Sequence, residues 1–387
     1  MSNVLVISYN KFPDGDAGAI REYTFGKLLE SMGHKIFFIG MGNTPCYHIG
    51  LFKGFEYTSL RINQYQTSPR KKLVNYFGFK QRLKQFIMQY TVENKIDTIL
   101  MVVIPINALF FIKRLAKKNN IKLIYDSVEW YSQEQFKLRR LAPLYILNDL
   151  YNRIFIDRSF KVIAISKYLE NHFKSRKIET VRIPVIMDVK NFRFEKYTKK
   201  DKLTILYAGS PGKKDYLKEI IEGIALLNSD ELEKIELRLI GFTREHLRGE
   251  LDIDEETLNK IKDNIKVLGR VPREIVLENL KQADFTVLLR SPVQRYAQAG
   301  FPSKVVESLA SATPVILNIT SDLGDYITDM EQGLIVADCS SLAFCDSLRR
   351  AINLTYEQRC EMCTKARECA EEYFNYDKYE QILSRII

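Results

Sequence analysis

Several patterns that would identify a particular class of protein are absent from this chain of 387 residues. Its six cysteines and four histidines show no spacing typical of a metal site. Cys360 and Cys363 have a CxxC spacing, but they lie in a predicted helix and no second pair accompanies them. We therefore expect reduced thiols, without a structural zinc, a redox pair or another bound metal.

The sequence also lacks an apolar run long enough to cross a bilayer, which takes about 20 residues. The longest run, Ile99–Ile112, contains Pro105 and Asn107, and it predicts a strand, a turn and the start of a helix. The first residues, Met1–Ser8, do not have the basic leader of a signal peptide. These features predict a cytoplasmic protein.

Charge is distributed unevenly along the chain. Residues 1–200 contain 34 Lys and Arg against 16 Asp and Glu, a net charge of +18, whereas residues 201–387 carry −8. A strongly basic first half indicates that this half faces an anionic surface. Because no motif that reads DNA or RNA is present, we do not expect the anion to be a nucleic acid.

Short apolar segments alternate with helical ones along most of the chain. One series begins at Val4–Ser8, and a second begins at Leu203–Ala208, after a lysine-rich stretch at 192–202. Strands alternating with helices predict parallel sheets covered by helices on both faces. The other elements that we expect are strands at Lys35–Ile39, Thr98–Val103, Lys122–Tyr125, Lys161–Ala164, Ile235–Ile240, Ile265–Leu268, Phe285–Leu289 and Pro314–Leu317, and helices at Ala19–Met32 and Lys218–Leu227.

The segment Ala299–Ile316 has the pattern of a phosphate-binding helix. Gly300 allows the backbone to approach a ligand closely, and Pro302 is typical of the first turn of a helix. The free amides at the start of such a helix attract an anion. Lys304 can neutralise phosphate, and Glu307 on the same face can accept hydrogen bonds from a pair of sugar hydroxyls. The segment suits a sugar nucleotide; the alternative is an ordinary amphipathic helix.

Basic residues follow two predicted strands of the second series. Lys213 and Lys214 come after a glycine-rich turn, an arrangement typical of phosphate binding, although the spacing is not that of a Walker motif. The alternative for each is a solvated surface lysine. Arg290 ends a strand at its carboxyl edge, where ligands of open parallel sheets lie. It either contacts phosphate or pairs with an acidic neighbour.

The segment Pro69–Lys84 is basic and rich in aromatic residues. Its apolar residues recur at helical spacing through Tyr90, which could place an apolar edge among lipid headgroups, or could simply face the core. We expect an anionic membrane surface to be bound through the cluster Arg70–Lys84. The basic side chains expected to meet lipid are Lys71, Lys72, Lys80, Arg82 and Lys84.

Several segments resemble the retaining, family-four type of glycosyltransferase (glycosyl transferases group 1), in its bacterial surface-polysaccharide subgroup. Gly15–Gly18 resembles the family's glycine-rich loop, and Tyr207–Asp215 resembles its diphosphate loop. Gly269–Val271 resembles the turn that touches the nucleotide base, and Phe374–Asp377 the element before the last helix. The matches span almost the entire chain. Two positions depart from the family pattern, because Ala299 replaces its first signature glutamate and Tyr125–Trp130 lacks its usual histidine.

The resemblance implies an α/β fold of the GT-B type, with two Rossmann-like domains that face each other across a cleft. We expect an acceptor domain at 1–192, a donor domain at 193–371, and a C-terminal helix at 372–387 that crosses back to the first domain. The implied donor-binding residues are Gly209, Ser210, Lys213, Lys214, Arg270, Val271, Arg290, Gly300, Phe301, Pro302, Ser303, Lys304 and Glu307.

On the acceptor side, Asp126 and Glu129 come directly after a predicted strand. We expect them, with Lys214, to contact the reacting groups; the alternatives are a helix N-cap for Asp126 and a surface role for Glu129. Asp14 and Asp16 superficially resemble a metal-binding Asp-x-Asp motif, but that motif needs a different sheet context. The residues expected to line the cleft here are Gly15, Asp16, Gly18 and Arg21, of which Arg21 can meet an anionic acceptor.

These observations predict an enzyme that transfers a sugar from a UDP- or GDP-sugar to a hydroxyl of a lipid-linked glycan, with retention and without a metal. The expected role is capsule or other surface-polysaccharide synthesis at the inner face of the cell membrane. Two alternatives remain: a catalytically inactive partner subunit, suggested by Ala299, and a sugar-nucleotide epimerase or phosphorylase on the same fold.

Overall fold

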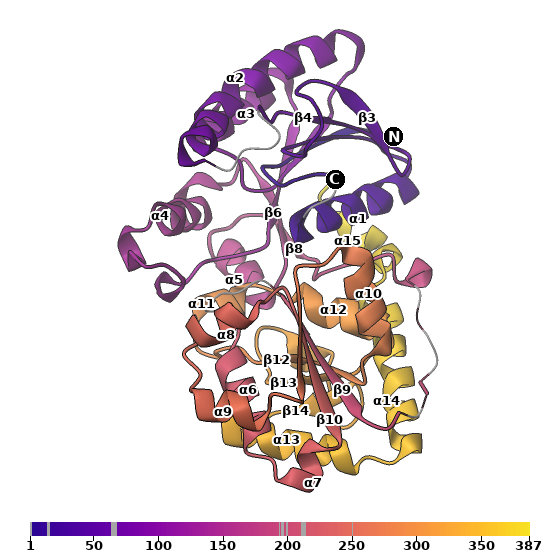
Figure 1. Ribbon diagram of the computed structural model, residues 1–387. Helices are drawn as coiled ribbons and strands as arrows, with labels where there is room; N and C mark the ends of the chain where they lie inside the picture. The colour runs from indigo at the N-terminus through magenta and orange to yellow at the C-terminus, as the bar shows by residue number, and fades with distance from the viewer. Residues whose placement is uncertain are drawn as a thin grey trace. The chain divides into compact units, whose positions relative to one another are not determined.

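The computed structural model describes residues 2–13, 16–62, 68–192, 194, 197–198, 200–209, 214–249 and 251–387. The chain divides into two compact units (Figure 1). The first unit contains Met1–Trp130, Pro143–Met187 and Tyr376–Ile387. The second unit contains Tyr131–Ala142 and Asp188–Asn375.

The first unit is built on an eight-stranded sheet in the order β3-β4-β2-β1-β5-β6-β7-β8. Neighbouring strands are parallel, except that β3 is antiparallel to β4. The central strands are almost continuously apolar, as expected for strands that are buried on both faces. The strands are β1 (Asn3–Ile7), β2 (Lys35–Gly40), β3 (Ile49–Phe52), β4 (Phe55–Ser59), β5 (Thr98–Met101), β6 (Lys122–Ser127), β7 (Lys161–Ala164) and β8 (Thr180–Arg182).

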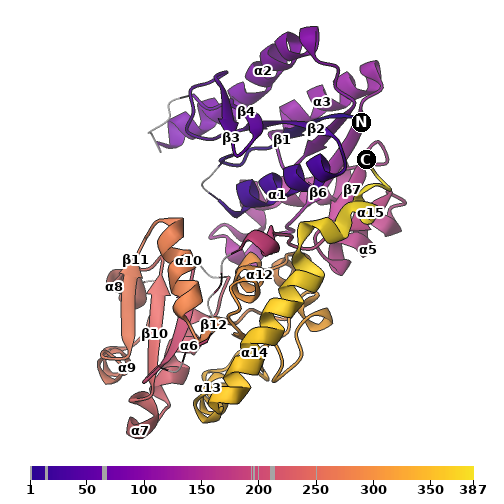
Figure 2. The same cartoon turned by 90° about the vertical axis from the view of Figure 1, so that its right-hand side faces the viewer.

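Helices cover both faces of this sheet (Figure 2). On one face, α1 (Ala17–Ser31) and the last helix, α15 (Glu380–Leu383), contribute to a single core in which Leu28 and Leu383 are buried with strand residues. On the other face, α2 (Pro69–Glu93) packs against α3 (Ile106–Asn119). The remaining α-helices of the unit are α4 (Pro143–Leu150) and α5 (Lys167–Ser175).

The second unit contains a six-stranded sheet in the order β11-β10-β9-β12-β13-β14, and all of its pairs are parallel. Its largest core packs α6 (Leu217–Ala225) and α13 (Ser341–Asn353) on one face, and α10 (Arg273–Gln282) packs on the other. The strands are β9 (Leu203–Ala208), β10 (Ile235–Ile240), β11 (Ile265–Gly269), β12 (Phe285–Leu288), β13 (Val315–Leu317) and β14 (Gly333–Ile335). The other α-helices are α7 (Ser229–Leu232), α8 (Arg244–Gly249), α9 (Glu255–Lys260), α11 (Arg295–Ala299), α12 (Ser303–Ala310) and α14 (Tyr356–Cys369).

The prediction of two mostly parallel sheets with helices on both faces is confirmed. Lys161–Ala164, Leu203–Ala208 and Ile235–Ile240 match the observed strands residue for residue. The sequence did not predict β3, β4, β8 or β14. Three of these four lie at sheet edges, and β8 and β14 are three residues long, so they carry little of the apolar pattern by which strands are recognised.

Candidate functional site

In the second unit, Asp215 joins two basic side chains that come from different elements. Its Oδ1 lies 2.7 Å from Nε of Arg290, which follows β12, and its Oδ2 lies 2.6 Å from Nζ of Lys304 in the first turn of α12. Asp215 itself lies in the segment that follows β9. Because the carboxyl ends of parallel strands meet at one edge of the sheet, the three side chains converge where ligands of such sheets bind.

Tyr207, in β9, completes this group. Its hydroxyl donates to Oδ2 of Asp215 at 2.6 Å and accepts from Nζ of Lys304 at 3.0 Å. The Lys304 ammonium also lies 4.2 Å from the centre of the Tyr207 ring. A Cβ at Gly209 would lie only 2.5 Å from Nζ of Lys304, so a side chain at this position would displace the lysine from its present place. We call Tyr207, Asp215, Arg290 and Lys304 the Asp215 cluster.

The Asp215 cluster carries two positive charges and one negative charge. Burial alone would raise the pKa of Asp215, but Lys304 and Arg290 hold it well below its usual range. Burial lowers the pKa of Lys304, and Asp215 opposes that shift. The side chain of Lys304 is 29% exposed and that of Arg290 is 15% exposed, so an anion from solvent can reach both. One positive charge is left uncompensated within the cluster, which is what a phosphate group needs.

Residues around the start of α12 fall into two groups. Gly300, Phe301 and Pro302 are buried. Phe301 packs against the rings of Tyr326 and Phe374, with centroids 5.7 and 5.8 Å away, so its side chain faces the core. Ser303 is half-buried at the helix start, where the described residues provide no side-chain cap. The amide of Val305 donates to the carbonyl of Pro302, which leaves the amides of Ser303 and Lys304 as the candidates to meet an anion.

Glu307, one turn further along α12, is ion-paired with α10. Its Oε1 accepts a hydrogen bond from Nη2 of Arg273 at 2.7 Å, and the carboxylate remains partly exposed. Arg270 is exposed in the turn that follows β11, whereas Val271 packs against the small core beneath α10. Gly269 has φ +68° in that turn, a conformation that favours glycine.

Lys214 contacts two tyrosines, Tyr296 and Tyr131. Its backbone carbonyl accepts from the hydroxyl of Tyr296, and its ammonium lies 5.7 Å from the centre of the Tyr131 ring. The segment that contains Tyr131 is tied to α11, because Nε of Arg295 donates to the Tyr131 carbonyl at 3.0 Å. Ser210 and Lys213, which we predicted to bind the donor, lie outside the described residues.

In the first unit, Arg21 and Asp126 form a buried ion pair. Nε and Nη2 of Arg21 donate to the two carboxylate oxygens of Asp126 at 2.8 and 2.9 Å. The same guanidinium donates to the carbonyls of Pro184 and Ile183. Asp126 lies inside β6, not at the start of a helix, so the N-cap alternative is wrong. The pair joins α1 and β6 to the segment that follows β8.

The other acceptor-side residues have mainly local contacts. Asp16 caps α1 by accepting from the amide of Ala19 at 2.8 Å. A Cβ at Gly18 would lie 2.4 Å from Nδ2 of Asn10. Glu129 is half-buried, and its backbone carbonyl accepts from Nδ2 of Asn148 at 3.2 Å. Gly15 lies outside the described residues.

Sequence reasoning missed three polar residues of these groups: Tyr207, Asp215 and Glu22. Glu22 on α1 is buried, and its carboxyl accepts hydrogen bonds from Ser8 and Asn10 at the end of β1. Burial raises the pKa of Glu22 to about 8. The spacing of Ser8 and Glu22 gave no signal in the sequence. Asp215 is the last residue of the segment that resembles the diphosphate loop, but in that segment the basic charge of Lys213 and Lys214 is the more obvious signal of phosphate binding.

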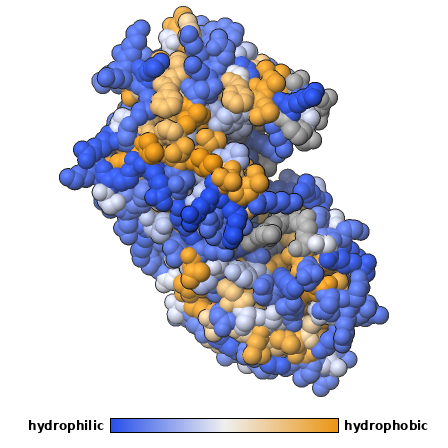
Figure 3. Space-filling view, turned by 90° about the vertical axis from the view of Figure 1, so that its left-hand side faces the viewer, coloured by the Kyte–Doolittle hydropathy of each residue, from blue (hydrophilic) through white to orange (hydrophobic). Residues whose placement is uncertain are grey.

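The predicted membrane segment forms α2, and one of its residues was assigned wrongly. Leu73, Val74 and Phe77 are exposed, and Figure 3 shows apolar atoms gathered over the first unit among hydrophilic ones. Arg82 is buried, however, and it donates to the carbonyls of Leu60 at 2.6 Å and Asn75 at 2.8 Å. Its charge therefore supports the protein backbone and does not meet lipid. Within the described residues, no helix is both long and apolar enough to span a membrane.

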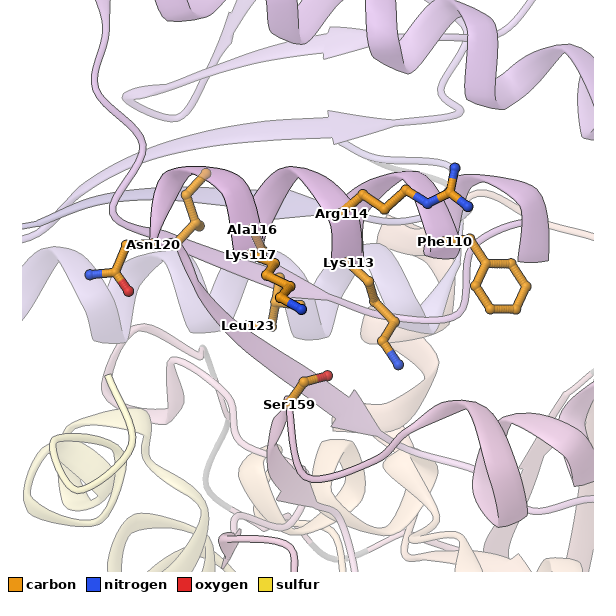
Figure 4. A pocket seen from close by; sticks show the side chains of 9 residues that line it. Phe110, Lys113, Arg114, Ala116, Lys117, Asn120, Leu123 and Ser159 are labelled. Atoms are coloured by element: carbon orange, nitrogen blue, oxygen red, sulfur yellow. The ribbon is translucent and has the colours of Figure 1, made fainter.

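A cavity of about 510 Å³ lies elsewhere in the first unit (Figure 4). Lys113, Arg114 and Lys117 on α3 line it, together with Leu123 of β6 and Ser159 before β7. It adjoins the beginnings of β6 and β7, the edge opposite to their carboxyl ends. None of the site residues predicted from the sequence lines this cavity.

Comparison with known proteins identifies the domain that carries the Asp215 cluster. Residues 188–371 match the family model of glycosyl transferases group 1. These residues, slightly less than half of the chain, are therefore similar to a group 1 domain. No curated protein matches the chain in sequence. The family match supports glycosyltransferase activity with a nucleotide-sugar donor.

Solved structures resemble the whole chain, not only the group 1 domain. Sucrose-phosphate synthase from Thermosynechococcus elongatus superimposes with a TM-score of 0.78 at 16% identity, covering 100% of this chain and 98% of its own. The Anabaena protein Alr3699/HepE in complex with UDP and glucose has a TM-score of 0.66 at 12% identity, covering 100% and 99%. WaaG, a glycosyltransferase involved in lipopolysaccharide biosynthesis, has a TM-score of 0.67 at 15% identity, covering 98% and 99%. The fold is GT-B.

Proposed function

We propose that this protein transfers a sugar from a nucleoside-diphosphate sugar to a hydroxyl of a glycan acceptor, with retention of anomeric configuration. The observation that carries the proposal is the placement of Lys304 and Arg290, 2.6 and 2.7 Å from the two oxygens of one carboxylate, at the carboxyl edge of the second sheet. Two partly exposed cations beside the uncapped start of α12 suit a diphosphate.

In the proposed reaction, the bond between the sugar C1 and the diphosphate oxygen breaks. The acceptor oxygen bonds to C1 on the same face, and its proton passes to the departing diphosphate. The protein then chiefly stabilises charge on the leaving group, through Lys304, Arg290 and the amides of α12. We assign Lys214 to the same task. Because the leaving group takes the proton, the reaction does not depend on a histidine.

The remaining predicted residues have supporting roles in this proposal. Glu307 accepts hydrogen bonds from the ribose hydroxyls, with Arg273 holding its carboxylate. Arg270 and Val271 contact the base. We propose that the first unit binds the acceptor, with Glu129 near the reacting groups and Asp126 and Arg21 supporting the sheet edge. The second unit binds the donor.

For the donor we favour a UDP-sugar, because Alr3699/HepE, whose fold this chain shares, was crystallised with UDP and glucose. A GDP-sugar is the alternative. We propose a lipid-linked acceptor in capsule or other surface-polysaccharide synthesis, reached from the inner face of the cell membrane. The support is the exposed side of α2, where Leu73 and Phe77 lie among basic side chains. Those side chains are Arg70, Lys71, Lys72, Lys80 and Lys84.

An inactive partner subunit is the second candidate, because Ala299 occupies the place of the first signature glutamate and is buried. The two candidates differ in what they do to a donor. Purified protein should be incubated with UDP-, GDP- and ADP-sugars, with and without lipid-linked glycans, and free nucleoside diphosphate should be measured. Slow donor hydrolysis without acceptor, and faster release with it, are expected. Nucleotide binding without any release would favour the inactive subunit, and an altered but uncleaved sugar nucleotide would indicate an epimerase.

A further inference from the structure

Three side chains contact the carboxylate of Asp215, those of Tyr207, Arg290 and Lys304. We propose that Asp215 is a positioning residue for the diphosphate of the donor: its carboxylate fixes the side chains of Lys304 and Arg290 next to one another, ready for two phosphates. This inference rests on the proposed function, since it concerns the same site. Asp215 does not itself bind the donor, because it carries the same sign of charge.

The geometry gives Asp215 this role. Each of its carboxylate oxygens takes one cation, Nε of Arg290 at 2.7 Å and Nζ of Lys304 at 2.6 Å, so one small group sets the spacing of both. Two like charges at that spacing repel each other unless an anion lies between them. The side chain of Asp215 is 7% exposed, so little water is available to screen the repulsion between the two cations if the carboxylate is removed.

The backbone and Tyr207 hold Asp215 in turn. Asp215 and Arg290 form an isolated antiparallel β-bridge, which ties the segment after β9 to the end of β12. The hydroxyl of Tyr207 donates to Oδ2 at 2.6 Å. The position of the carboxylate is therefore set by two neighbouring strands, so the cations are positioned before a ligand arrives.

Asp215 also affects the protonation of Lys304. Burial favours the neutral amine of Lys304, and Arg290 adds to that effect, whereas Asp215 favours the charged form. Replacing Asp215 by asparagine keeps the shape of the side chain but removes the opposing charge. Lys304 then loses its proton at a lower pH, and diphosphate affinity falls with it.

The test measures the affinity of UDP and GDP by calorimetry from pH 7 to pH 10.5, for wild type and Asp215→Asn. Wild type should bind one of the two and lose affinity on the alkaline side. In Asp215→Asn that loss should occur at least about one pH unit lower. Lys304→Arg, which keeps its charge throughout this range, should lose affinity only where the base of the nucleotide itself ionises, and the difference from wild type identifies Lys304 as the titrating group. Tyr207→Phe should shift the loss in the same direction but by less.

Asp284→Asn provides the matched control. Asp284 is a buried aspartate in the same unit that precedes β12, at the strand end opposite to Arg290, and it accepts from the amide of Thr204 and from Lys200. Asp284→Asn should lower the melting temperature. The alkaline limb, the part of the pH profile in which affinity for UDP or GDP falls, should stay where it is in wild type. If Asp284→Asn moved that limb as much as Asp215→Asn, the shift would report general loosening, and the proposal would be overturned.

Turnover separates this inference from the proposed function. With an active donor and acceptor, Asp215→Asn should lower kcat about tenfold to a hundredfold at pH 7.5, more than it raises KM for the donor. Normal wild-type transfer with an unmoved alkaline limb in Asp215→Asn would overturn the positioning role alone. A shifted limb without transfer by wild type would overturn the proposed function alone. Failure of wild type to bind either nucleotide would overturn both.

Discussion

The guanidinium of Arg21 and the carboxylate of Asp126 form two hydrogen bonds, at 2.8 and 2.9 Å, although the residues are 105 positions apart in the sequence. Arg21 lies in α1 and Asp126 lies in β6, and the side chains of both are at least nine-tenths buried. A charge buried this deeply is tolerated only with its partner.

Removing one partner of this pair should therefore destabilise the protein. We expect Arg21→Met to lower the free energy of unfolding by about 3–5 kcal/mol, because Asp126 is left as a buried, unpaired charge. The double variant Arg21→Met/Asp126→Leu should recover part of that loss. Urea unfolding of the first unit, followed by the fluorescence of Trp130, measures both. If Arg21→Met were as stable as wild type, the ion pair would contribute nothing to the free energy of unfolding. Binding of the acceptor would then be the better explanation for Arg21.

Glu307 is expected to matter for nucleotide binding more than for folding. Its ion pair with Arg273 is partly exposed, so Glu307→Ala should lower the free energy of unfolding by less than about 1 kcal/mol. The same change should remove the stabilisation by saturating UDP, about 2.7 kcal/mol at 100 times the dissociation constant. Thermal unfolding with and without nucleotide tests this, with Arg273→Ala as the control for the ion pair. An unchanged shift in Glu307→Ala would rule out the ribose contact.

The exposed side of α2 should bind anionic membranes. Replacing Lys71, Lys72, Lys80 and Lys84 with glutamine should abolish co-sedimentation with vesicles that contain anionic lipid, since each basic residue contributes about 1 kcal/mol at such a surface. Neutral vesicles should bind weakly, and salt should weaken the anionic interaction. The control changes the basic residues Arg114, Lys117 and Lys118 of α3. Unchanged pelleting of the quadruple variant would remove the support for a lipid-linked acceptor.

Arg82 gives the opposite prediction from its neighbours on α2. Because its guanidinium supports the carbonyls of Leu60 and Asn75, Arg82→Gln should lower the melting temperature. Vesicle binding by the fraction that remains folded should be normal. Both can be measured on one preparation. A loss of vesicle binding at full stability would place the Arg82 charge at the lipid surface.

Glu22 should make stability depend on pH in a defined direction. Its pKa is raised to about 8 in the folded protein, mainly by burial, and is about 4.3 in the unfolded chain. Between these values the folded state holds one more proton than the unfolded state, so its contribution to stability falls as pH rises from about 4.3 towards 8. In urea unfolding, the free energy of unfolding of Glu22→Gln should change less with pH across this window than that of wild type. Parallel curves for the two proteins would contradict the buried, protonated carboxyl.

Local patterns in the sequence were sufficient to predict most of the fold, and they failed where long-range contacts decide the outcome. Lys304 and Arg290 could be predicted because each stands at a recognisable position, one at the start of a helix and the other at the end of a strand. Asp215 could not, because its two cationic partners are 75 and 89 residues away. Arg82 was predicted to lie at the surface, because a run of basic residues in the sequence does not reveal which of their side chains is buried against the protein.

The route of the chain constrains how the protein is made. The first unit is assembled from three separated segments, and its core includes Leu383 and Ile386 from the last of them. The amide of Tyr376 donates to the carbonyl of Met187 at 3.0 Å, where this last segment joins the rest of the unit. Domains usually fold in the order in which the ribosome releases them. Here the core of the first unit includes residues that follow the whole of the second unit in the sequence, so this core can close only after the segment Tyr376–Ile387 has left the ribosome.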